Sequence, residues 1–394
     1  MTDSQLQTTE TKAEIKSRLE RLETLYDLSL DIFAAKNLDD LLRVVMSRVT
    51  SALGADRSTL FIVNQDAEIL WSKVAQGTEP IILPMGVGLA GMVAASGETL
   101  NIPDAYLDDR FNSEIDKKTG YHTKTILCMP VKDREGNVVA VIQAINKIGG
   151  AFSEDDEDFL RALSAQIQLA IENSTLYQGL KELFESMIEA LASTIDARHP
   201  TTAGHTNRVR NYSLEIAKEM GYSPADLEIL NYAALLHDYG KIGVPEAILT
   251  KPGKLTDVEY EAMKRHANYT IEILSRIKFP KQYREIPNIA GHHHEKMDGS
   301  GYPDGLSGDN LHPLSRVMAV ADVFDAMTSF REYRNPANPD KVLEMLKADS
   351  GTAFDGDAVD AFERYYHKSN LGDLIRDRND EEKAALELAR AETG

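Results

Sequence analysis

A histidine and an aspartate stand side by side at the end of an apolar run. The segment NYAALLHD closes on His237 and Asp238, and Lys241 follows three residues later. An imidazole nitrogen and a carboxylate at one helix end are ligands of the kind that Fe, Mn or Zn takes, rather than Ca. One pair is insufficient, because a divalent ion takes about four to six donors. Further donors must therefore come from elsewhere in the chain.

Candidate donors crowd the same half of the sequence. Eight of the ten histidines fall between positions 199 and 312, whereas histidines that served only solubility would be scattered. Asp322 lies in the apolar segment VMAVADVF, where a carboxylate is costly to bury without a positive partner. We attribute this aspartate to a metal site, and a buried salt bridge is the alternative. The candidate donors are His205, His237, Asp238, His266, two members of the run His292, His293 and His294, and Asp322.

A glycine-rich segment follows the histidine run. In EKMDGSGYPDGL, three glycines and a proline between positions 299 and 305 predict a tight loop. Next to a metal site, such a loop is suited to form the edge of a substrate pocket. An ordinary surface turn is the alternative.

The elements that would carry these donors are helices. After position 200, apolar residues recur at helical spacing to the end of the chain, and Thr256 with Glu259 forms a capping box at one helix start. The second half is therefore predicted to be all-helical. Its expected helices are 207–220, 224–237, 256–275, 283–293, 314–328, 339–350, 357–368 and a charged tail helix.

A single helical pattern also runs from 155 to 198 without a proline, and Gly179 is its only glycine. A helix of this length exceeds an ordinary globular helix. One interpretation is two shorter helices packed locally. We favour a helical connector in a parallel homodimer, which would carry motion between domains.

The first half mixes helical and strand periods. Helices are predicted at 13–35 and 38–53, and Gly54 ends the second. Alternating patterns predict strands, and the sequence DREG at 133–136 predicts a hairpin turn between the last two. The expected strands are 58–64, 69–74, 81–83, 125–131 and 138–146. This mixture is typical of an α+β sensor domain.

The composition limits the partners and the compartment. With 43 lysines and arginines against 63 aspartates and glutamates, the 394-residue chain has a net charge of −20, which argues against a nucleic-acid partner. No apolar run approaches the roughly 18 residues of a membrane span, and the start has no signal-peptide core. The single cysteine, Cys128, cannot form an internal disulfide and is expected in the core. We therefore expect a cytoplasmic protein without a membrane span.

The motifs of the second half resemble those of the HD-GYP family over about residues 180–375. They occur in order as HDYGK at 237–241, HHEKMDGSGYP at 293–303, AVADVFDAMTS from Ala319 and REYR at 331–334. The family consists of bacterial phosphodiesterases that hydrolyse cyclic di-GMP at a two- or three-iron centre in an all-helical fold. This chemistry fits the residues, because a phosphodiester needs a nucleophile and charge neutralisation, which two bridged metal ions provide.

The resemblance implies a role for each matching residue. The implied metal ligands are His205, His237, Asp238, His266, His293, His294 and Asp322. Asp238 would bridge the ions and act with Lys241 in catalysis, while the implied substrate contacts are Tyr302, Arg331 and Arg334. Some relatives hold a third metal with an acidic residue where this chain has Thr201, so we expect two divalent ions, iron first and manganese as the alternative. His292 extends the usual histidine pair to three.

The first half resembles a GAF domain over about residues 38–175. Asn146-Lys147, Phe152 and Asp156-Glu157 match the NKFDE signature of GAF domains similar to those of cyclic-nucleotide phosphodiesterases, which implies a structural ion pair between Lys147 and Asp156. A turn at 88–91 could meet a phosphate through its N–H groups. If the pocket is used, the matching ligand positions are Leu89, Ala90, Asp116, Thr119 and Thr123. The region near 75–76 lacks the aromatic–acid pair of guanine-reading relatives, so a cyclic nucleotide, another small ligand and a purely dimerising role stay open.

Together these features predict a multidomain signalling enzyme. The expected segments are an N-terminal start and helix at 1–37, an α+β GAF domain at 38–175, a connector helix at 155–198, an all-α HD-GYP domain at 180–375 and a charged tail at 376–394. The expected reaction is hydrolysis of cyclic di-GMP to pGpG or GMP, regulated by a small ligand such as cAMP or cGMP. The alternatives are another cyclic dinucleotide substrate, such as cyclic GMP–AMP, and a non-catalytic regulator that acts through the GYP loop. A regulator that has lost its activity should lack some of the candidate ligands or Lys241, whereas this sequence retains all of them.

Overall fold

The computed structural model describes residues 38–75, 81–198, 204–330 and 335–393, together with six single positions between 19 and 30. The helix expected at 13–35 lies largely outside these ranges, as do Thr201, Arg331 and Arg334. The chain divides into two compact units, Met1–Lys181 and Glu182–Gly394. Within the described ranges, no helix combines the length and the apolar character that a bilayer crossing requires.

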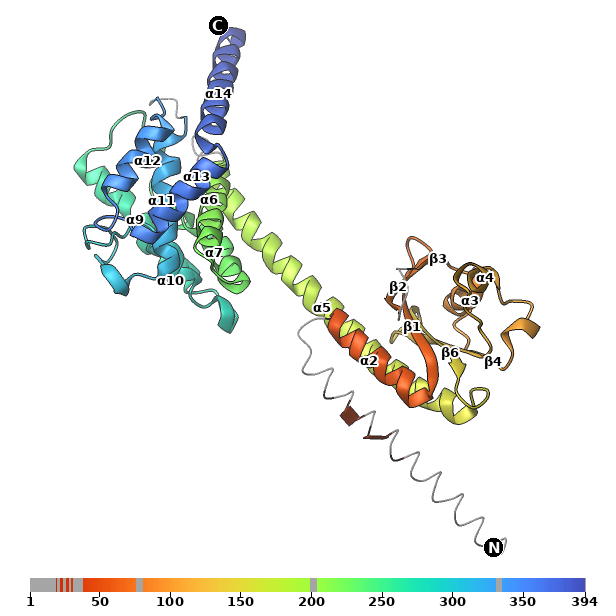
Figure 1. Cartoon of the computed structure of the whole chain (residues 1–394). Helices are drawn as coiled ribbons and strands as arrows, with labels where there is room; N and C mark the ends of the chain where they lie inside the picture. Colours follow the sequence, from red (N-terminus) through yellow and green to blue (C-terminus); the bar gives the residue numbers. More distant parts are fainter. Residues whose placement is uncertain are drawn as a thin grey trace, which may run out of the picture. The chain divides into compact units, whose positions relative to one another are not determined.

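The first unit is a six-stranded antiparallel sheet with helices on both faces, in the order β3-β2-β1-β6-β5-β4 (Figure 1). Its strands are β1 (Ala55–Asn64), β2 (Ile69–Ala75), β3 (Ile82–Pro84), β4 (Leu100–Ile102), β5 (Ile126–Lys132) and β6 (Val138–Lys147). Its helices are α2 (Leu38–Leu53), α3 (Gly88–Ser96), the short η1 (Ala105–Leu107), α4 (Glu114–Thr119) and the first part of α5 (Glu154–Arg198). The predicted α+β architecture is confirmed.

Alternation along the strands divides the apolar side chains between two cores. Leu60 and Ile142 pack with α2 and α5, whereas their neighbours Phe61 and Val141 pack with α3 on the other face. Successive residues of a strand point to opposite faces, so neighbours in sequence enter different cores. Cys128 is buried in the α3 core, as predicted.

Several elements of this unit differ from the prediction. The helix 38–53 and the five predicted strands are present, but α3, α4 and β4 were not expected. The segment 88–91, predicted as a phosphate-binding turn, is instead the first turn of α3, because Leu89 and Ala90 are buried against the sheet. β4 has three residues, too few for alternation to be recognised.

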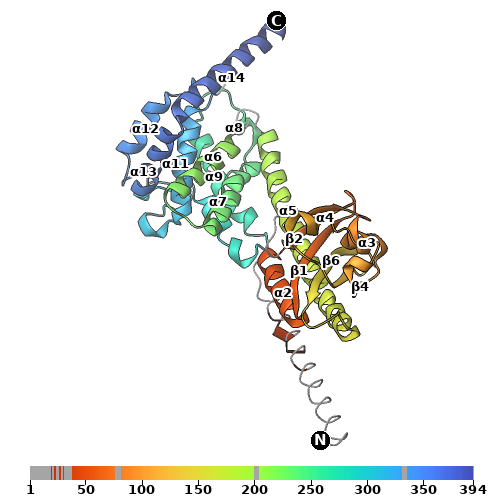
Figure 2. The ribbon, with the colours of Figure 1, turned by 45° about the vertical axis from the view of Figure 1, so that its right-hand side comes forward.

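The second unit is helical throughout its described part, as predicted (Figure 2). Its elements are α6 (His205–Glu219), α7 (Pro224–Leu236), η3 (Tyr239–Gly243), α8 (Glu246–Leu249), α9 (Asp257–Leu274), η4 (Lys281–Tyr283), α10 (Ile286–Gly291), η5 (Gly308–Asn310), α11 (Pro313–Thr328), α12 (Pro339–Ala348), α13 (Gly356–Lys368) and α14 (Leu371–Thr393). The capping box of Thr256 with Glu259 is confirmed at the start of α9. The predicted helix 283–293 is wrong in length, because α10 begins next to Pro287, which has no N–H for a preceding turn.

Helix α5 is continuous over 45 residues, in agreement with the single long helical pattern. In the first unit, its residues Phe159, Leu163 and Ile167 pack into the core beneath the sheet. In the second unit, Ile188 and Ala192 pack into the helical core. One helix therefore contributes to two separate hydrophobic cores, and its role in a homodimer stays a prediction.

Candidate metal centre

Two groups of donor side chains lie in the second unit, and most of their members stand at or next to helix ends. His205 begins α6, His237 follows the last residue of α7, and Asp238 precedes η3. The ligand atoms of these three residues lie within 4.8 Å of one another. A second group with the same spacing consists of His266 in α9 and of His293 and His294, which follow the end of α10.

Asp238 faces both groups. Its Oδ2 lies 3.6 Å from Nε2 of His205 and 3.3 Å from Nε2 of His237. Its Oδ1 lies 3.4 Å from Nε2 of His266 in the second group. The two oxygens of one carboxylate therefore point to different sets of histidines, which is the placement that a bridging ligand requires.

Asp322 on α11 has the same relationship to the two groups. Its Oδ1 lies 3.2 Å from Nε2 of His205, and its Oδ2 lies 3.6 Å from Nδ1 of His294. The carboxylate is buried in the apolar segment 317–324 of this helix. With Asp322, the structure brings together all seven residues proposed from the sequence as metal ligands.

Three of the histidines are held in one tautomer by the backbone. In each ring Nδ1 is bonded to the carbonyl oxygen three residues earlier, and the pairs are His237–Ala234 at 2.7 Å, His266–Met263 at 2.7 Å and His293–Ala290 at 2.6 Å. A carbonyl only accepts, so Nδ1 carries the hydrogen and Nε2 keeps its lone pair. These Nε2 atoms are buried and have no hydrogen-bond partner among the described residues. Buried lone pairs that gather around two carboxylates fit a metal ion.

Burial also keeps the three imidazoles of the second group neutral. It lowers the pKa of His266 and of His293 below the ordinary value of 6.5, and it lowers the pKa of His294 to about 3. A neutral ring can share its lone pair with a metal ion, whereas an imidazolium cannot. The rings are therefore in the protonation state that coordination needs.

The two carboxylates stay ionised despite their burial. Burial opposes the charge of Asp238, but the positive charge of Lys241 outweighs this effect and holds the pKa of this carboxyl well below its ordinary value. Burial likewise opposes the charge of Asp322, but its interaction with His205 outweighs this effect and lowers its pKa. Ionised carboxylates together with neutral imidazoles form the donor set of Fe, Mn or Zn.

Sequence reasoning missed Asp325, which supports His205 from behind. Its Oδ2 accepts from Nδ1 of His205 at 2.8 Å, and its Oδ1 accepts from Nε of Arg208 at 2.7 Å. Burial lowers the pKa of His205, but hydrogen bonds to Asp322 and Asp325 outweigh this effect and raise it to about 9, so metal binding at Nε2 would release a proton from this ring. The signal was present in the sequence, because Asp325 is a second carboxylate in the same apolar helix, three residues beyond Asp322.

The short helix η3 brings Lys241 to the centre, where its Nζ forms an ion pair with Oδ2 of Asp238. η3 is seated directly on α9, since the N–H of Gly240 donates to Oγ1 of Thr270 at 2.9 Å. A side chain at Gly240 has no room, because its Cβ would lie 1.9 Å from the carbonyl oxygen of His266. This close contact between η3 and α9 sets the distance between Lys241 and the second histidine group.

Of the residues proposed to bind substrate, Tyr302 lies at the centre. Its ring is 4.7 Å from that of His294 between centroids, and Nζ of Lys264 lies 5.7 Å from its ring centre. Arg331 and Arg334 are outside the described residues. The structure thus places one of the three proposed substrate contacts next to a candidate ligand.

The sequence matches the GAF domain family over residues 37–171 and the HD domain family over residues 189–358. The chain carries a GAF domain followed by an HD domain. The order of the two domains agrees with the prediction.

Relatives of known function match part of the chain. It is 41% identical over 180 residues to the 3′3′-cGAMP-specific phosphodiesterase 3 of Vibrio cholerae, covering 46% of this chain and 38% of the relative. It is 38% identical over 205 residues to a cyclic di-GMP phosphodiesterase response regulator of Xanthomonas campestris, covering 52% and 53%. It is 40% identical over 200 residues to a cyclic di-GMP phosphodiesterase of Thermotoga maritima, covering 51% and 53%. The chain spans about half or less of the length of these curated relatives.

In the GAF domain, the predicted ion pair between Lys147 and Asp156 is confirmed. Nζ of Lys147 lies 2.7 Å from Oδ2 of Asp156, whose side chain is fully buried. Lys147 also donates to the carbonyl of Leu53 at 3.0 Å, and Asp156 accepts from the N–H of Ser153 at 2.9 Å. The pair therefore joins the end of α2, the end of β6 and the start of α5.

The residues proposed for a GAF ligand are mostly engaged within the domain. Leu89 and Ala90 are buried in α3. Asp116 accepts from the N–H of Thr123 at 2.7 Å and from its Oγ1 at 2.9 Å, which holds α4 to the following loop. The side chain of Thr119 is outside the described residues. Ligand binding at these positions stays a proposal.

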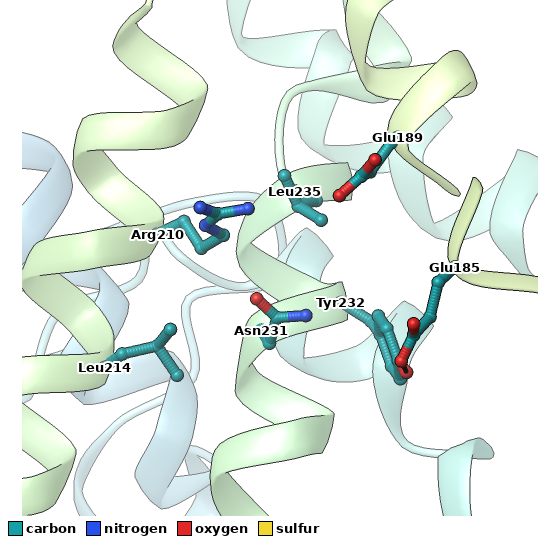
Figure 3. Close-up of a pocket in the computed structure, with 7 residues that line it drawn as sticks. All are labelled: Glu185, Glu189, Arg210, Leu214, Asn231, Tyr232 and Leu235. Atoms are coloured by element: carbon teal, nitrogen blue, oxygen red, sulfur yellow. Dashed lines mark hydrogen bonds between the residues drawn. The ribbon is translucent and has the colours of Figure 1, made fainter. Parts of the chain in front are cut away.

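The HD domain also has a pocket of about 280 Å³ whose lining includes none of the seven candidate ligands (Figure 3). Side chains of α5, α6 and α7 form it, namely Glu185, Glu189, Arg210, Leu214, Asn231, Tyr232 and Leu235. At one end the hydroxyl of Tyr232 donates to Glu185 at 3.0 Å, which ties α7 to α5. The pocket is thus a mostly polar cavity at the place where α5, α6 and α7 pack together.

Proposed function

We propose that this chain is a metal-dependent phosphodiesterase of the HD-GYP type that hydrolyses cyclic di-GMP to linear pGpG or GMP. The observation that carries the proposal is that Asp238 and Asp322 each face both histidine groups, with Lys241 paired to Asp238. The similar proteins of Xanthomonas campestris and Thermotoga maritima, named as cyclic di-GMP phosphodiesterases, support the same substrate.

Two divalent ions, iron first and manganese as the alternative, would be held by the seven side chains of the centre, with Asp238 as the bridge. When bound, such ions activate water and neutralise phosphoryl charge. Metal analysis of protein purified without oxygen tests the site. About two ions per chain are expected, and protein without bound metal under reducing conditions would contradict the proposal.

Lys241 and Tyr302 would act on the substrate from two sides. Lys241 holds a positive charge beside Asp238, where it can stabilise the charge that develops on the phosphoryl oxygens or protonate the leaving oxygen. Tyr302 forms the wall next to His294. Arg331 and Arg334 would bind the substrate phosphates.

Cyclic GMP–AMP is a second candidate substrate, because the Vibrio cholerae relative at 41% identity is named as specific for it. Metal-loaded protein should be incubated with each dinucleotide and the products separated by chromatography, with Asp238→Ala as the control. Turnover of cyclic di-GMP with the higher kcat/KM supports the main proposal, and preference for cyclic GMP–AMP selects the second. If neither is cleaved, a non-catalytic role of the GYP loop is favoured.

The GAF domain would bind a small regulatory ligand, with cAMP and cGMP as the first candidates. Adding each nucleotide to the turnover assay tests this role, and a changed rate is expected with one of them. If neither nucleotide alters the rate or binds, a different ligand or a dimerising role is favoured. The unpaired Cys128 supports the proposal that the protein acts in a reducing compartment, the cytoplasm.

Two chains would associate through α5. Five exposed apolar residues are spaced along this helix, namely Leu169, Leu176, Leu180, Leu183 and Met187. Their spacings of seven, four, three and four residues approximate the heptad pattern of a coiled coil. Light scattering of the full chain is expected to give the mass of a dimer. The substitution Leu180→Glu should give a monomer, and a monomeric unmodified chain would contradict the proposal.

A further inference from the structure

The loop after His294 returns Tyr302 to the metal centre. The N–H of Tyr302 donates to the carbonyl of His294 at 3.3 Å, and the two rings lie 4.7 Å apart between centroids. Gly301 permits this return, because a Cβ there would lie 2.5 Å from Cα of Glu295. The position of the loop therefore sets the wall that a substrate would meet beside His294.

His292 is bonded to this loop rather than to either donor group. Its ring is 8% exposed. Nδ1 lies 2.7 Å from the carbonyl oxygen of Asn288 in α10, and Nε2 lies 3.0 Å from Oδ2 of Asp304. The third histidine of the run, which the sequence left without a role, thus connects α10 to the residue two positions after Tyr302.

Glu295, which follows His293 and His294 in the sequence, is bonded to the same loop residue, Asp304. Its side chain is buried, and its Oε1 accepts from the backbone N–H of Asp304 at 2.7 Å. Asp304 is therefore bonded through its carboxylate to His292 and through its backbone to Glu295. These two partners flank His293 and His294 in the sequence, so the loop is attached directly to the ligand segment.

We propose that His292 and Asp304 form a latch that holds Tyr302 over His294 and thereby sets the affinity for substrate. The inference rests on the proposed function for the identity of that substrate. Lys241 is held by η3 against α9, independently of the loop, so the groups of the chemical step stay in place when the latch is opened. His292 and Asp304 are positioning residues, because they act through Tyr302.

Kinetics of the metal-loaded full chain test the latch with His292→Ala, Asp304→Ala and the double variant. We expect KM to rise roughly tenfold with kcat within about twofold, since one hydrogen bond to a charged group is lost. The double variant should be no worse than either single variant, because both remove the same contact. Asp304→Asn should restore a KM close to that of the unmodified chain, since the side-chain amide can donate to Nε2 of a neutral His292 ring. His367→Ala, at a histidine with a 66% exposed side chain, is the matched control.

Hydrogen exchange provides a readout that does not depend on the substrate. In His292→Ala and Asp304→Ala, amides of residues 296–306 should exchange faster, while those of α9 should not change. Asp304 has a 55% exposed side chain, so its substitution leaves the core intact. Additive effects on KM, loss of metal from Asp304→Ala or unchanged exchange in the loop would overturn the latch. Absence of turnover in the unmodified chain would instead contradict the proposed function, and the exchange data would still decide on the latch.

Discussion

Nδ1 of His205 donates to the buried carboxylate of Asp325 at 2.8 Å, while Nε2 of the same ring faces Asp322 at 3.2 Å. Nε2 of His205 thus faces the other candidate ligands, and Nδ1 is oriented by a residue outside them; a metal ion at Nε2 would replace the proton there. Carboxylates in this position fix the ring and raise its strength as a ligand. Arg208 balances the charge of Asp325, so the support is itself held in place.

Asp325→Asn is expected to weaken metal binding by roughly 10–100-fold, because the charged acceptor behind His205 is lost. The amide oxygen can still accept from Arg208, which limits damage to the fold. Metal content after dialysis against a graded chelator series measures the effect. The exposed Asp309 offers the control substitution Asp309→Asn. If Asp325→Asn retains metal as well as the unmodified chain does, the support has no influence on binding.

Lys241→Ala is expected to lower kcat by about 10²–10³-fold while metal content stays unchanged. The substitution removes the positive charge beside Asp238, but it removes no candidate ligand. Steady-state kinetics and metal analysis on the same preparation separate these effects. Lys254→Ala, at an exposed lysine of the α8–α9 loop, is the control. Loss of metal along with activity would assign Lys241 a structural role instead.

Asp156→Asn is expected to lower the free energy of unfolding of the GAF domain by about 1–3 kcal/mol at pH 7. Lys147 would lose its charged partner while the shape of the buried side chain is kept. The single tryptophan, Trp71, lies in β2, so its fluorescence in urea reports on this domain. Asp158→Asn, at a carboxylate with 78% side-chain exposure, should leave the transition in place.

The effect of Asp156→Asn should also depend on pH. Burial opposes ionisation of Asp156, but Lys147 and Ser153 outweigh it and lower its pKa. A carboxyl with a lowered pKa stabilises the fold above its unfolded pKa of about 3.9 and loses that contribution as the pH falls through the folded value. The difference between the unmodified chain and the variant should therefore be full at pH 7 and shrink below about pH 4. If the difference in the free energy of unfolding between the two proteins stayed constant down to about pH 2, the ion pair could not be its origin.

Gly240→Ala is expected to reduce turnover by about 10²-fold or more, because the new Cβ would displace η3 from α9 and move Lys241 and Asp238. Gly179→Ala in α5 is the matched control, since no atom of the described structure outside its own helix turns lies within 4 Å of the added Cβ. That variant should keep its activity and gain up to about 1 kcal/mol of helix stability. Equal activity of both variants would show that the η3–α9 contact does not position the centre.

Elements with long, strong periodicity were predictable from the sequence, and α5 is the clearest case because no proline interrupts its pattern. α3 was missed because its residues are almost uniformly small and apolar, so they show no polar face. The seven candidate ligands were proposed from their residue types and order, and the structure places them together. The contact between His292 and Asp304 could not be predicted, since it joins residues twelve positions apart and depends on how the loop between them folds back.

The rings of His237, His266 and His293 are oriented by carbonyl oxygens of Ala234, Met263 and Ala290. Every residue type has that carbonyl, so the identity of the side chain at the three supporting positions is irrelevant to the orientation. Ala234 and Ala290 are themselves fully buried, so a larger side chain there would act through packing and not through the hydrogen bond. Comparison of sequences alone would leave these supports unseen, because the atoms that orient the rings belong to the backbone.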